Sequence, residues 1–229
     1  MGANSPDGYY TEGLAAERLR RCYEVAPPRV QDYLQAETDF VLRHMRPRDS
    51  VLELGCGYGR VLGAMTGLAH PIVGIDTSRK SLELAREVTG GPPRCYLAAM
   101  DAARLAFRAR SFDVVVCIQN GLSAFKVDRG ALFKEAVRVT RPAGRVFFSS
   151  YAKSFWPDRL EWFRIQAAQG LVGEIDEDAT GDGVIVCRDG FRAETVDPEE
   201  FIRLAASVGA YPKIAEVGGS SLFCVIHVH

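Results

Sequence analysis

Two patterns of apolar residues recur along the chain: short continuous apolar runs, and longer segments with apolar residues three or four positions apart. The continuous runs predict strands buried on both faces, and the wider spacing predicts amphipathic helices. The predicted strands occupy residues 51–54, 71–76, 94–99, 111–120, 145–151, 211–217 and 222–229. The predicted helices occupy residues 14–24, 28–45, 60–68, 78–88, 129–140 and 198–208.

The order of these elements predicts the fold class. Strands and helices alternate through residues 51–151, which indicates an α/β fold with a doubly wound, mostly parallel sheet covered on both faces. Only four residues, 218–221, with the turn Gly218-Gly219-Ser220, separate the last two strands, so we expect a C-terminal hairpin whose final strand runs antiparallel in the sheet. The sequence thus predicts a sheet of seven strands.

Two segments lie outside this alternation. Residues 1–48 combine an arm rich in Gly, Pro, Asn and Asp with two predicted helices, and we interpret them as an N-terminal cap. Residues 49–229 then form the main domain. Residues 152–196 follow the fifth strand as a lid-like insertion. Its aromatic segment at residues 155–163 predicts a helix that roofs the site, and the alternative is that these aromatic residues simply pack in a core.

A glycine-rich turn, VLELGCGYGR at residues 51–60, connects the first strand to the next helix. Glycines at positions 55, 57 and 59 allow a sharp turn and let a ligand lie directly on the main chain. A dinucleotide-binding turn requires Gly or Ala where Arg60 stands, and a P-loop would end in Gly-Lys-Ser/Thr. The spacing therefore argues against both of those nucleotide sites.

Three stretches resemble motifs of one family. ELGCGYGR at residues 53–60 resembles the first motif of the class I S-adenosylmethionine (SAM) methyltransferases. MDAARLAF at residues 100–107 and SFDVVV at residues 111–116 look like the third and fourth. Seven strands ending in a hairpin are also that family's arrangement. The resemblance covers residues 49–151 and 197–229, and it implies SAM as cofactor and methyl transfer by direct displacement.

The resemblance also implies how the cofactor is held. Glu53 would lie at the strand end, and the glycines would pass beneath the methionine part of SAM. Asp101 would accept from the adenine amine, and the backbone N–H of Ala102 would meet the ring. The expected cofactor-binding set is Glu53, Gly55, Cys56, Gly57, Gly59, Arg60, Asp76, Thr77, Asp101, Ala102, Gln119 and Asn120.

Asp76 has a role that follows from its position. It closes the second predicted strand, where an acid in nucleotide-binding α/β domains accepts hydrogen bonds from both ribose hydroxyls. The alternative is that Asp76 caps the following helix, although Thr77 and Ser78 can do so instead.

The expected acceptor site combines the strand ends with the lid. Asn120 ends the fourth strand, and its amide can bind the amino-acid end of the cofactor or the substrate; the alternative is a turn with Gly121. The arm and the insertion both carry aromatic residues, as a closing lid would. The substrate-lining candidates are Tyr9, Tyr10, Asn120, Tyr151 and Trp156. No residue is assigned as a general base, and the four histidines are interpreted as structural.

Charge and motif content favour a small-molecule acceptor. The net charge of −1 gives no global attraction to nucleic acid. The Asn/Asp-Pro-Pro-Tyr/Phe motif of nucleic acid amine methyltransferases is absent, because residues 119–122 are Gln-Asn-Gly-Leu. An RNA or protein methyltransferase, or a SAM-binding protein without turnover, remains an alternative. The acceptor atom and the oligomeric state are left open.

We expect no metal site and a reducing, cytoplasmic environment. Residues 176–181 match part of a calcium loop, but Cys187 stands where the bidentate Glu belongs. The six cysteines include no C-x-x-C pair, which favours free buried thiols. The first ten residues do not resemble a signal peptide, and no apolar run approaches the ~20 residues of a membrane span.

Overall fold

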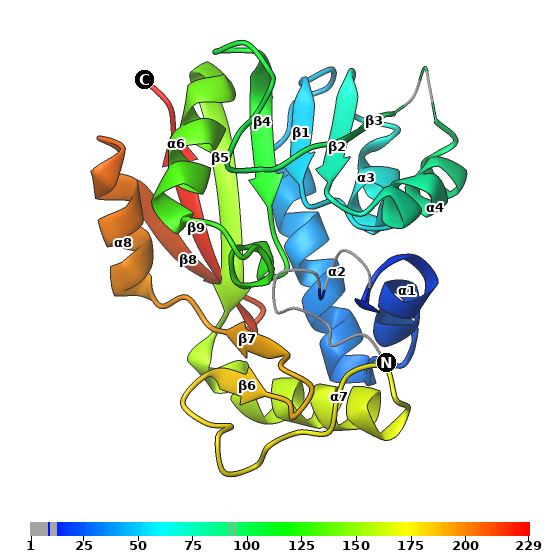
Figure 1. Ribbon diagram of the computed structural model, residues 1–229. Coiled ribbons are helices and arrows are strands. Elements are labelled where there is room, and N and C mark those ends of the chain that lie inside the picture. Colours follow the sequence, from blue (N-terminus) through cyan, green and yellow to red (C-terminus); the bar gives the residue numbers. More distant parts are fainter. Residues whose placement is uncertain (1–8, 10–12, 92, 94) are drawn as a thin grey trace.

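A seven-stranded sheet with the order β3-β2-β1-β4-β5-β9-β8 forms the centre of the computed structural model (Figure 1), which describes residues 9, 13–91, 93 and 95–229. The strands are β1 (Val51–Leu54), β2 (Ile72–Asp76), β3 (Tyr96–Ala99), β4 (Phe112–Cys117), β5 (Thr140–Tyr151), β8 (Pro212–Val217) and β9 (Ser221–His227). Strands β1 to β5 pair in parallel, and β9 is antiparallel to both β5 and β8. The predicted doubly wound sheet with a C-terminal hairpin is confirmed.

The helices are α1 (Ala16–Glu24), α2 (Pro28–Arg43), α3 (Arg60–Met65), α4 (Arg79–Thr89), α5 (Gly121–Ala124), α6 (Arg129–Val139), α7 (Trp156–Ala168) and α8 (Pro198–Ser207), with a 3-10 turn η3 (Lys153–Phe155). The insertion also contains a hairpin of β6 (Val184–Val186) and β7 (Arg192–Glu194). Helix α3 ends three residues before the predicted end. Helix α5 was not predicted, because four residues are too few to show helical periodicity.

Apolar residues on both faces of the sheet account for the continuous apolar runs. In β4, Val114 and Val116 pack in the core that contains α2 and α3 side chains. Their neighbours Val115 and Cys117 pack in the opposite core, with Phe133 of α6. These four side chains of β4 are fully buried. Successive strand residues point to opposite faces, so a strand covered on both sides needs apolar residues at every position.

The N-terminal helices and the insertion share a third apolar core, which we call the cap core. It joins Tyr33 of α2, Trp162 of α7 and Ile185 of β6, and the indole Nε1–H of Trp162 donates to the carbonyl of Cys22 in α1 at 2.9 Å. Figure 1 shows α1, α7 and the β6–β7 pair below the sheet, on the side where the arrows of β1, β2 and β4 end. The later part of α2, including Val41, packs instead on the sheet. Helix α2 therefore connects the cap to the sheet.

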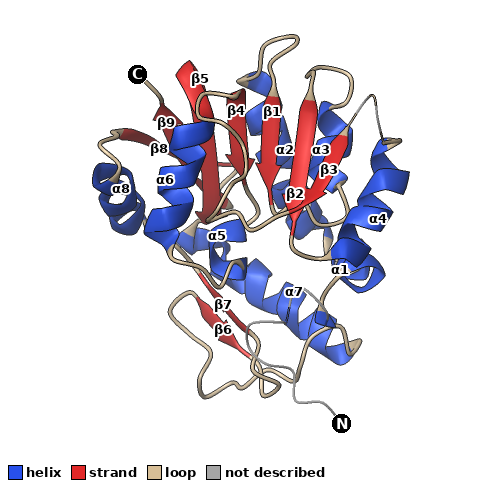
Figure 2. Ribbon diagram, turned by 45° about the horizontal axis from the view of Figure 1, so that its top comes forward, coloured by secondary structure: helices blue, strands red, loops and turns tan. Residues whose placement is uncertain are grey.

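The strand order reverses beside β1. The chain passes from β1 to β2 on one side, whereas β4 pairs with the other side of β1. Connections that leave a parallel sheet in opposite directions open a crevice at the carboxyl ends of the strands. Figure 2 shows the cap elements on this side, with α5 beside the lower end of β5.

Candidate functional site

A cavity of about 390 Å³ lies between the carboxyl ends of the parallel strands and the cap. The sequence-predicted residues that line it are Tyr9, Glu53, Gly55, Cys56, Gly57, Arg60, Asp76, Thr77, Asp101, Ala102, Gln119, Asn120 and Tyr151. Gly59 and Trp156 are not part of the lining, and Tyr10 lies outside the described residues. The fold thus brings together residues from segments that are far apart in the sequence.

The glycine turn forms one wall of the cavity. Gly55, Gly57 and Gly59 have φ angles of 71°, 52° and 84°, in the left-handed region that side chains disfavour. A Cβ atom on Gly55 would also collide with the ring of Phe125. Gly59 instead lies against Ala85 of α4, so its small size serves helix packing rather than the cavity.

Asp76 holds the glycine turn from the end of β2. Its Oδ2 accepts from the backbone N–H of Gly57 at 2.9 Å, and its Oδ1 accepts from the N–H of Ser78 at 2.8 Å. Burial raises the pKa of the Asp76 carboxyl, and these backbone bonds oppose the rise. The helix cap itself is Ser78, whose hydroxyl accepts from Ser81 N–H. Asp76 therefore presents a carboxylate to the cavity while fixing the turn beside it.

Glu53 and Arg60 place a carboxyl group and a guanidinium beside the glycine turn. Glu53 is only 6% exposed, and its Oε2 has no hydrogen-bond partner among the described residues. The same holds for Nε and Nη2 of Arg60, whose guanidinium lies over the Tyr23 ring at 5.3 Å. Burial raises the pKa of Glu53 to about 8, although the nearby charge of Arg60 lowers it. Buried polar atoms without partners are rare in folded proteins, so these atoms point to a polar ligand.

The loop after β3 contributes an exposed acid at the cavity edge. Asp101 accepts from the N–H of Ala103 at 2.8 Å through Oδ1, while Ala102 is buried in the cavity wall. The loop begins at Met100, whose N–H donates to the carbonyl of Asp76. This bond keeps the Asp101 loop next to the end of β2.

Two consecutive left-handed residues end β4. Gln119 and Asn120 have φ angles of 58° and 59°, a strained conformation that is typical of functional sites. The N–H of Gln119 donates to Glu37 Oε2 and to the Ser149 hydroxyl, both at 2.8 Å. The Asn120 amide donates to the Glu194 carbonyl at 2.9 Å and accepts from the Ser150 hydroxyl. Asn120, expected to bind a ligand, thus ties the insertion to the sheet while it lines the cavity.

Aromatic residues of the cap line the opposite wall. Tyr9 is 5% exposed, its ring lies 5.1 Å from that of Phe191, and its hydroxyl donates to Asp189 Oδ2 at 2.8 Å. Trp162 and Phe163 of α7 also line the wall, where the sequence suggested Trp156. The Trp156 ring instead lies beside the Arg159 guanidinium, whose Cζ is 5.7 Å from the centre of that ring.

Several groups that often carry chemistry are elsewhere. None of the four histidines lines the cavity, and the His44 ring bonds the Phe40 carbonyl. Within the described part of the chain, no three His, Cys, Asp or Glu side chains cluster as metal ligands do. All six cysteines are free and buried, as predicted. No helix in the described ranges is long and apolar enough to cross a membrane.

Comparison with known proteins gives this cavity a context. Residues 51–144 match the family model described as a methyltransferase domain. These are the residues that contain the glycine turn, Asp76, Asp101 and the strained end of β4. Residues 51–144 are a methyltransferase domain.

Individual relatives agree with this domain assignment. Malonyl-[acyl-carrier protein] O-methyltransferase of Marinomonas sp. is 31% identical over 142 residues, which cover 59% of this chain and 51% of that protein. A ubiquinone biosynthesis O-methyltransferase of Thiobacillus denitrificans is 33% identical over 110 residues, or 46% and 47% of the two chains. This chain spans about half the length of the curated relatives it matches.

A solved structure extends the similarity in fold to most of the chain. The 1,6-didemethyltoxoflavin-N1-methyltransferase of Burkholderia thailandensis, with bound 1,6-didemethyltoxoflavin and S-adenosylhomocysteine, superposes with a TM-score of 0.55 at 16% identity. The match covers 93% of this chain and 78% of that one. The class I methyltransferase fold predicted from the sequence is therefore confirmed.

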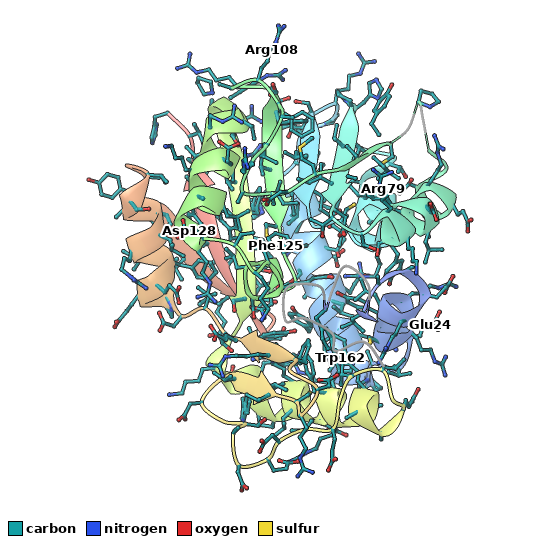
Figure 3. All side chains as sticks on the ribbon, viewed as in Figure 1. Glu24, Arg79, Arg108, Phe125, Asp128 and Trp162 are labelled. Atoms are coloured by element: carbon teal, nitrogen blue, oxygen red, sulfur yellow. The ribbon has the colours of Figure 1, made fainter. Side chains whose placement is uncertain are left out.

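Sequence reasoning missed several residues around the methyltransferase domain's cavity. They are Tyr23, Phe125, Trp162, Phe163, Gln166 and Phe191. Figure 3 labels Phe125 near the strand ends and Trp162 on the cap. The four-residue spacing of Trp162 and Gln166 could have indicated a shared helix face, but nothing local shows that this face meets the cavity.

The raised pKa of Glu53 makes the stability of the methyltransferase domain depend on pH. Folding raises this pKa from 4.5 to about 8, so between these values the folded protein holds a proton that the unfolded chain releases. The free energy of unfolding without ligand must therefore fall as pH rises through this window. Between pH 5 and pH 8, the free energy of unfolding of Glu53→Gln should fall by roughly 3 kcal/mol less than that of the wild type. Urea unfolding measures both.

The control for this experiment is Glu83→Gln, which changes an exposed glutamate on α4. This variant should keep the wild-type pH dependence. Burial also raises the pKa of Glu37 to about 7, so part of the slope must persist in every variant. An unaltered slope in Glu53→Gln would show that Glu53 ionises normally.

Proposed function

We propose that the chain binds SAM and transfers its methyl group to a small-molecule acceptor. The observation that carries the proposal is the pair of Glu53 and Arg60, with buried polar atoms that lack partners among the described residues. An amino acid carries an ammonium and a carboxylate, which are complementary to this acid and this guanidinium. The glycine turn between them leaves main chain exposed to such a ligand.

Further residues would hold the rest of the cofactor. Asp76 would accept from the ribose hydroxyls, and Asp101 from the adenine amine, with Ala102 against the ring. Cys56, Thr77 and Gln119 line the same space and would complete the contacts. The distribution of charge supports this placement of the cofactor. Arg60 lies at the glycine turn, where the amino-acid carboxylate would bind, and the acids that would accept from the ribose and the adenine follow β2 and β3.

Methyl transfer requires alignment more than covalent chemistry from the protein. SAM supplies a methyl group on a positively charged sulfur. The acceptor would take the methyl group by direct displacement: the carbon–sulfur bond breaks with its electron pair staying on sulfur, and the acceptor's proton would be released to solvent with the product. The cap would hold the acceptor in line and exclude water from the reaction. We assign no general base.

Enclosure by the cap supports a small acceptor over RNA or protein. The cavity wall opposite the glycine turn consists of buried aromatic side chains rather than an open basic groove. The proteins named above include a ubiquinone biosynthesis O-methyltransferase and, among structures of similar fold, a 1,6-didemethyltoxoflavin-N1-methyltransferase. A SAM-binding protein without turnover is the alternative outside enzymes.

We further propose an organisation and a location. Residues 49–229 would form the catalytic domain, and residues 1–48 together with residues 152–196 would form its cap, because they share the cap core. Six free buried cysteines support a reducing compartment, and hence the cytoplasm.

Calorimetry on the purified protein tests the cofactor. SAM and S-adenosylhomocysteine should bind, whereas NAD should not, since the glycine spacing does not suit a dinucleotide. A screen of small molecules with methyl-labelled SAM then tests turnover. Binding of NAD without SAM would overturn the proposal. SAM binding without turnover on any small molecule or cell extract would favour the non-catalytic alternative.

We expect methyl transfer to survive metal chelation. Direct displacement from a sulfonium can proceed by alignment alone, and the acids at the cavity have other roles in the proposal. The measurement is turnover before and after dialysis against EDTA, with S-adenosylhomocysteine binding as the control for an intact site. Loss of turnover that magnesium restores would reveal a metal requirement.

A further inference from the structure

The cap half of the cavity has walls of aromatic rings. Trp162 and Phe163 have ring centres 5.8 Å apart, and Phe163 lies 5.5 Å from Phe191. Tyr9 continues the series, with its ring centre 5.1 Å from that of Phe191. All four residues are buried and line the cavity. Flat apolar faces at these separations favour a planar ligand, which can stack on them or meet their edges.

One polar group in this aromatic wall has no partner among the residues that the structure describes. The side chain of Gln166, one helical turn after Trp162, is 3% exposed and lines the cavity. Its Nε2 makes no hydrogen bond to any described residue. In contrast, the Tyr9 hydroxyl donates to Asp189 and the Trp162 indole donates to the Cys22 carbonyl. A buried amide donor left open in an apolar wall selects a ligand with a hydrogen-bond acceptor at that place.

A buried positive charge lies behind the same wall. The fully buried Arg159 guanidinium stacks over the Tyr151 ring at 4.2 Å and lies 5.8 Å from the Phe163 ring. It donates to the carbonyls of Gly183 and Ala193. Among the described residues, the carboxylates that line the cavity lie instead at the ends of β1, β2 and β3. The aromatic wall by itself could hold a cation, but Arg159 makes a cationic ligand unfavourable there.

We propose that the methyl acceptor is an uncharged, planar aromatic molecule with a carbonyl oxygen or ring nitrogen that accepts a hydrogen bond from Gln166. Its rings lie among Trp162, Phe163 and Phe191, and its nucleophilic atom faces the glycine turn. The inference rests on the proposed function, because it assigns the glycine-turn half of the cavity to SAM. It makes Gln166 a specificity-determining residue, and Arg159 a group that selects against amines.

Three related molecules test the inference: 6-hydroxyquinoline, its isostere 2-naphthol, and 6-hydroxy-N-methylquinolinium, which is larger by one methyl group. The first has a ring nitrogen, the second a C–H in its place, and the third a fixed positive charge. Binding is measured by calorimetry at pH 8 with S-adenosylhomocysteine saturating. For the wild-type protein we expect 6-hydroxyquinoline to bind and the quinolinium to bind at least about 10-fold more weakly.

Gln166→Leu removes the donor while it keeps the side chain's size. We expect this variant to bind 6-hydroxyquinoline about 10- to 100-fold more weakly and 2-naphthol almost unchanged. Gln169→Leu, on the exposed end of α7, is the matched control and should bind all three as the wild type does. Thermal unfolding and S-adenosylhomocysteine affinity establish that each variant is folded.

The outcomes separate this inference from the proposed function. If S-adenosylhomocysteine fails to bind, the proposed function fails. If it binds but the quinolinium binds as tightly as 6-hydroxyquinoline, or none of the three binds, the inferred acceptor class is wrong. If Gln166→Leu loses equal affinity for 6-hydroxyquinoline and 2-naphthol, the inference is also wrong. If Gln166→Leu does not fold, the wild-type comparison decides, and a wild type that does not prefer 6-hydroxyquinoline to the quinolinium overturns the inference.

Discussion

Deleting residues 1–13 should abolish methyl transfer, with a loss of at least about 100-fold, while the sheet stays folded. Tyr9 is the described residue of this segment that lines the cavity. Its buried ring packs on Phe191, and its hydroxyl bonds Asp189 of the insertion. Without Tyr9 the cap side opens to water, and the acceptor loses one of its walls. Turnover with methyl-labelled SAM, on an acceptor found by the screen, measures the loss.

SAM affinity should fall only in part in the same truncation, because the glycine turn, Glu53 and Asp76 remain. Tyr9→Phe is the matched control: it keeps the ring and removes the hydroxyl with its bond to Asp189, so we expect roughly a 10-fold loss or less. Circular dichroism checks that the truncated protein is folded. A truncated protein that turns over at the full rate would show that the arm is an ordinary chain end.

Asp76→Ala should weaken SAM binding by about 1–3 kcal/mol, or roughly 5- to 150-fold in Kd. The substitution removes the acceptor pair proposed for the ribose hydroxyls. It also frees the N–H groups of Gly57 and Ser78, so the glycine turn loses its anchor. Asp76→Asn keeps one acceptor oxygen and should give an intermediate affinity. Calorimetric titration with SAM and S-adenosylhomocysteine provides the measurement.

Asp113→Ala is the control that separates affinity from stability. Asp113 lies in β4 and does not line the cavity, yet it holds backbone in a similar way: its Oδ2 accepts from the N–H and hydroxyl of Ser50. This variant should lose stability while its SAM affinity stays the same. If Asp76→Ala binds SAM as the wild type does, Asp76 has no place in the cofactor site.

The glycine-turn half of the cavity, where we propose that SAM binds, could be predicted because local sequence determines its geometry. Three glycines at alternate positions between a buried strand and a helix specify the turn, and one acid at the next strand end specifies Asp76. Alternation of strands and helices places both at the same edge of the sheet. These signals lie within about 30 residues of one another, so no long-range contact had to be known.

The cap half depends on contacts that no local pattern contains. The segment from Phe155 to Phe163 is apolar on several helix faces, so its periodicity could not separate Trp156 from Trp162. Packing against α1 decides the choice, since the Trp162 indole bonds the Cys22 carbonyl. The sequence likewise indicated that the Asn120 amide is available to a ligand. In the structure this amide donates a hydrogen bond to the Glu194 carbonyl of the insertion.

The sequence alone thus determined the sheet, the glycine turn and the acids at the strand ends, because strand and turn geometry depend on neighbouring residues. Only the tertiary structure decided which aromatic rings close the cavity and which buried polar atoms remain without partners. Those outcomes depend on how residues 9, 22, 162 and 191 meet across the cap core. Side-chain packing between distant segments selects one arrangement among many that have the same local pattern.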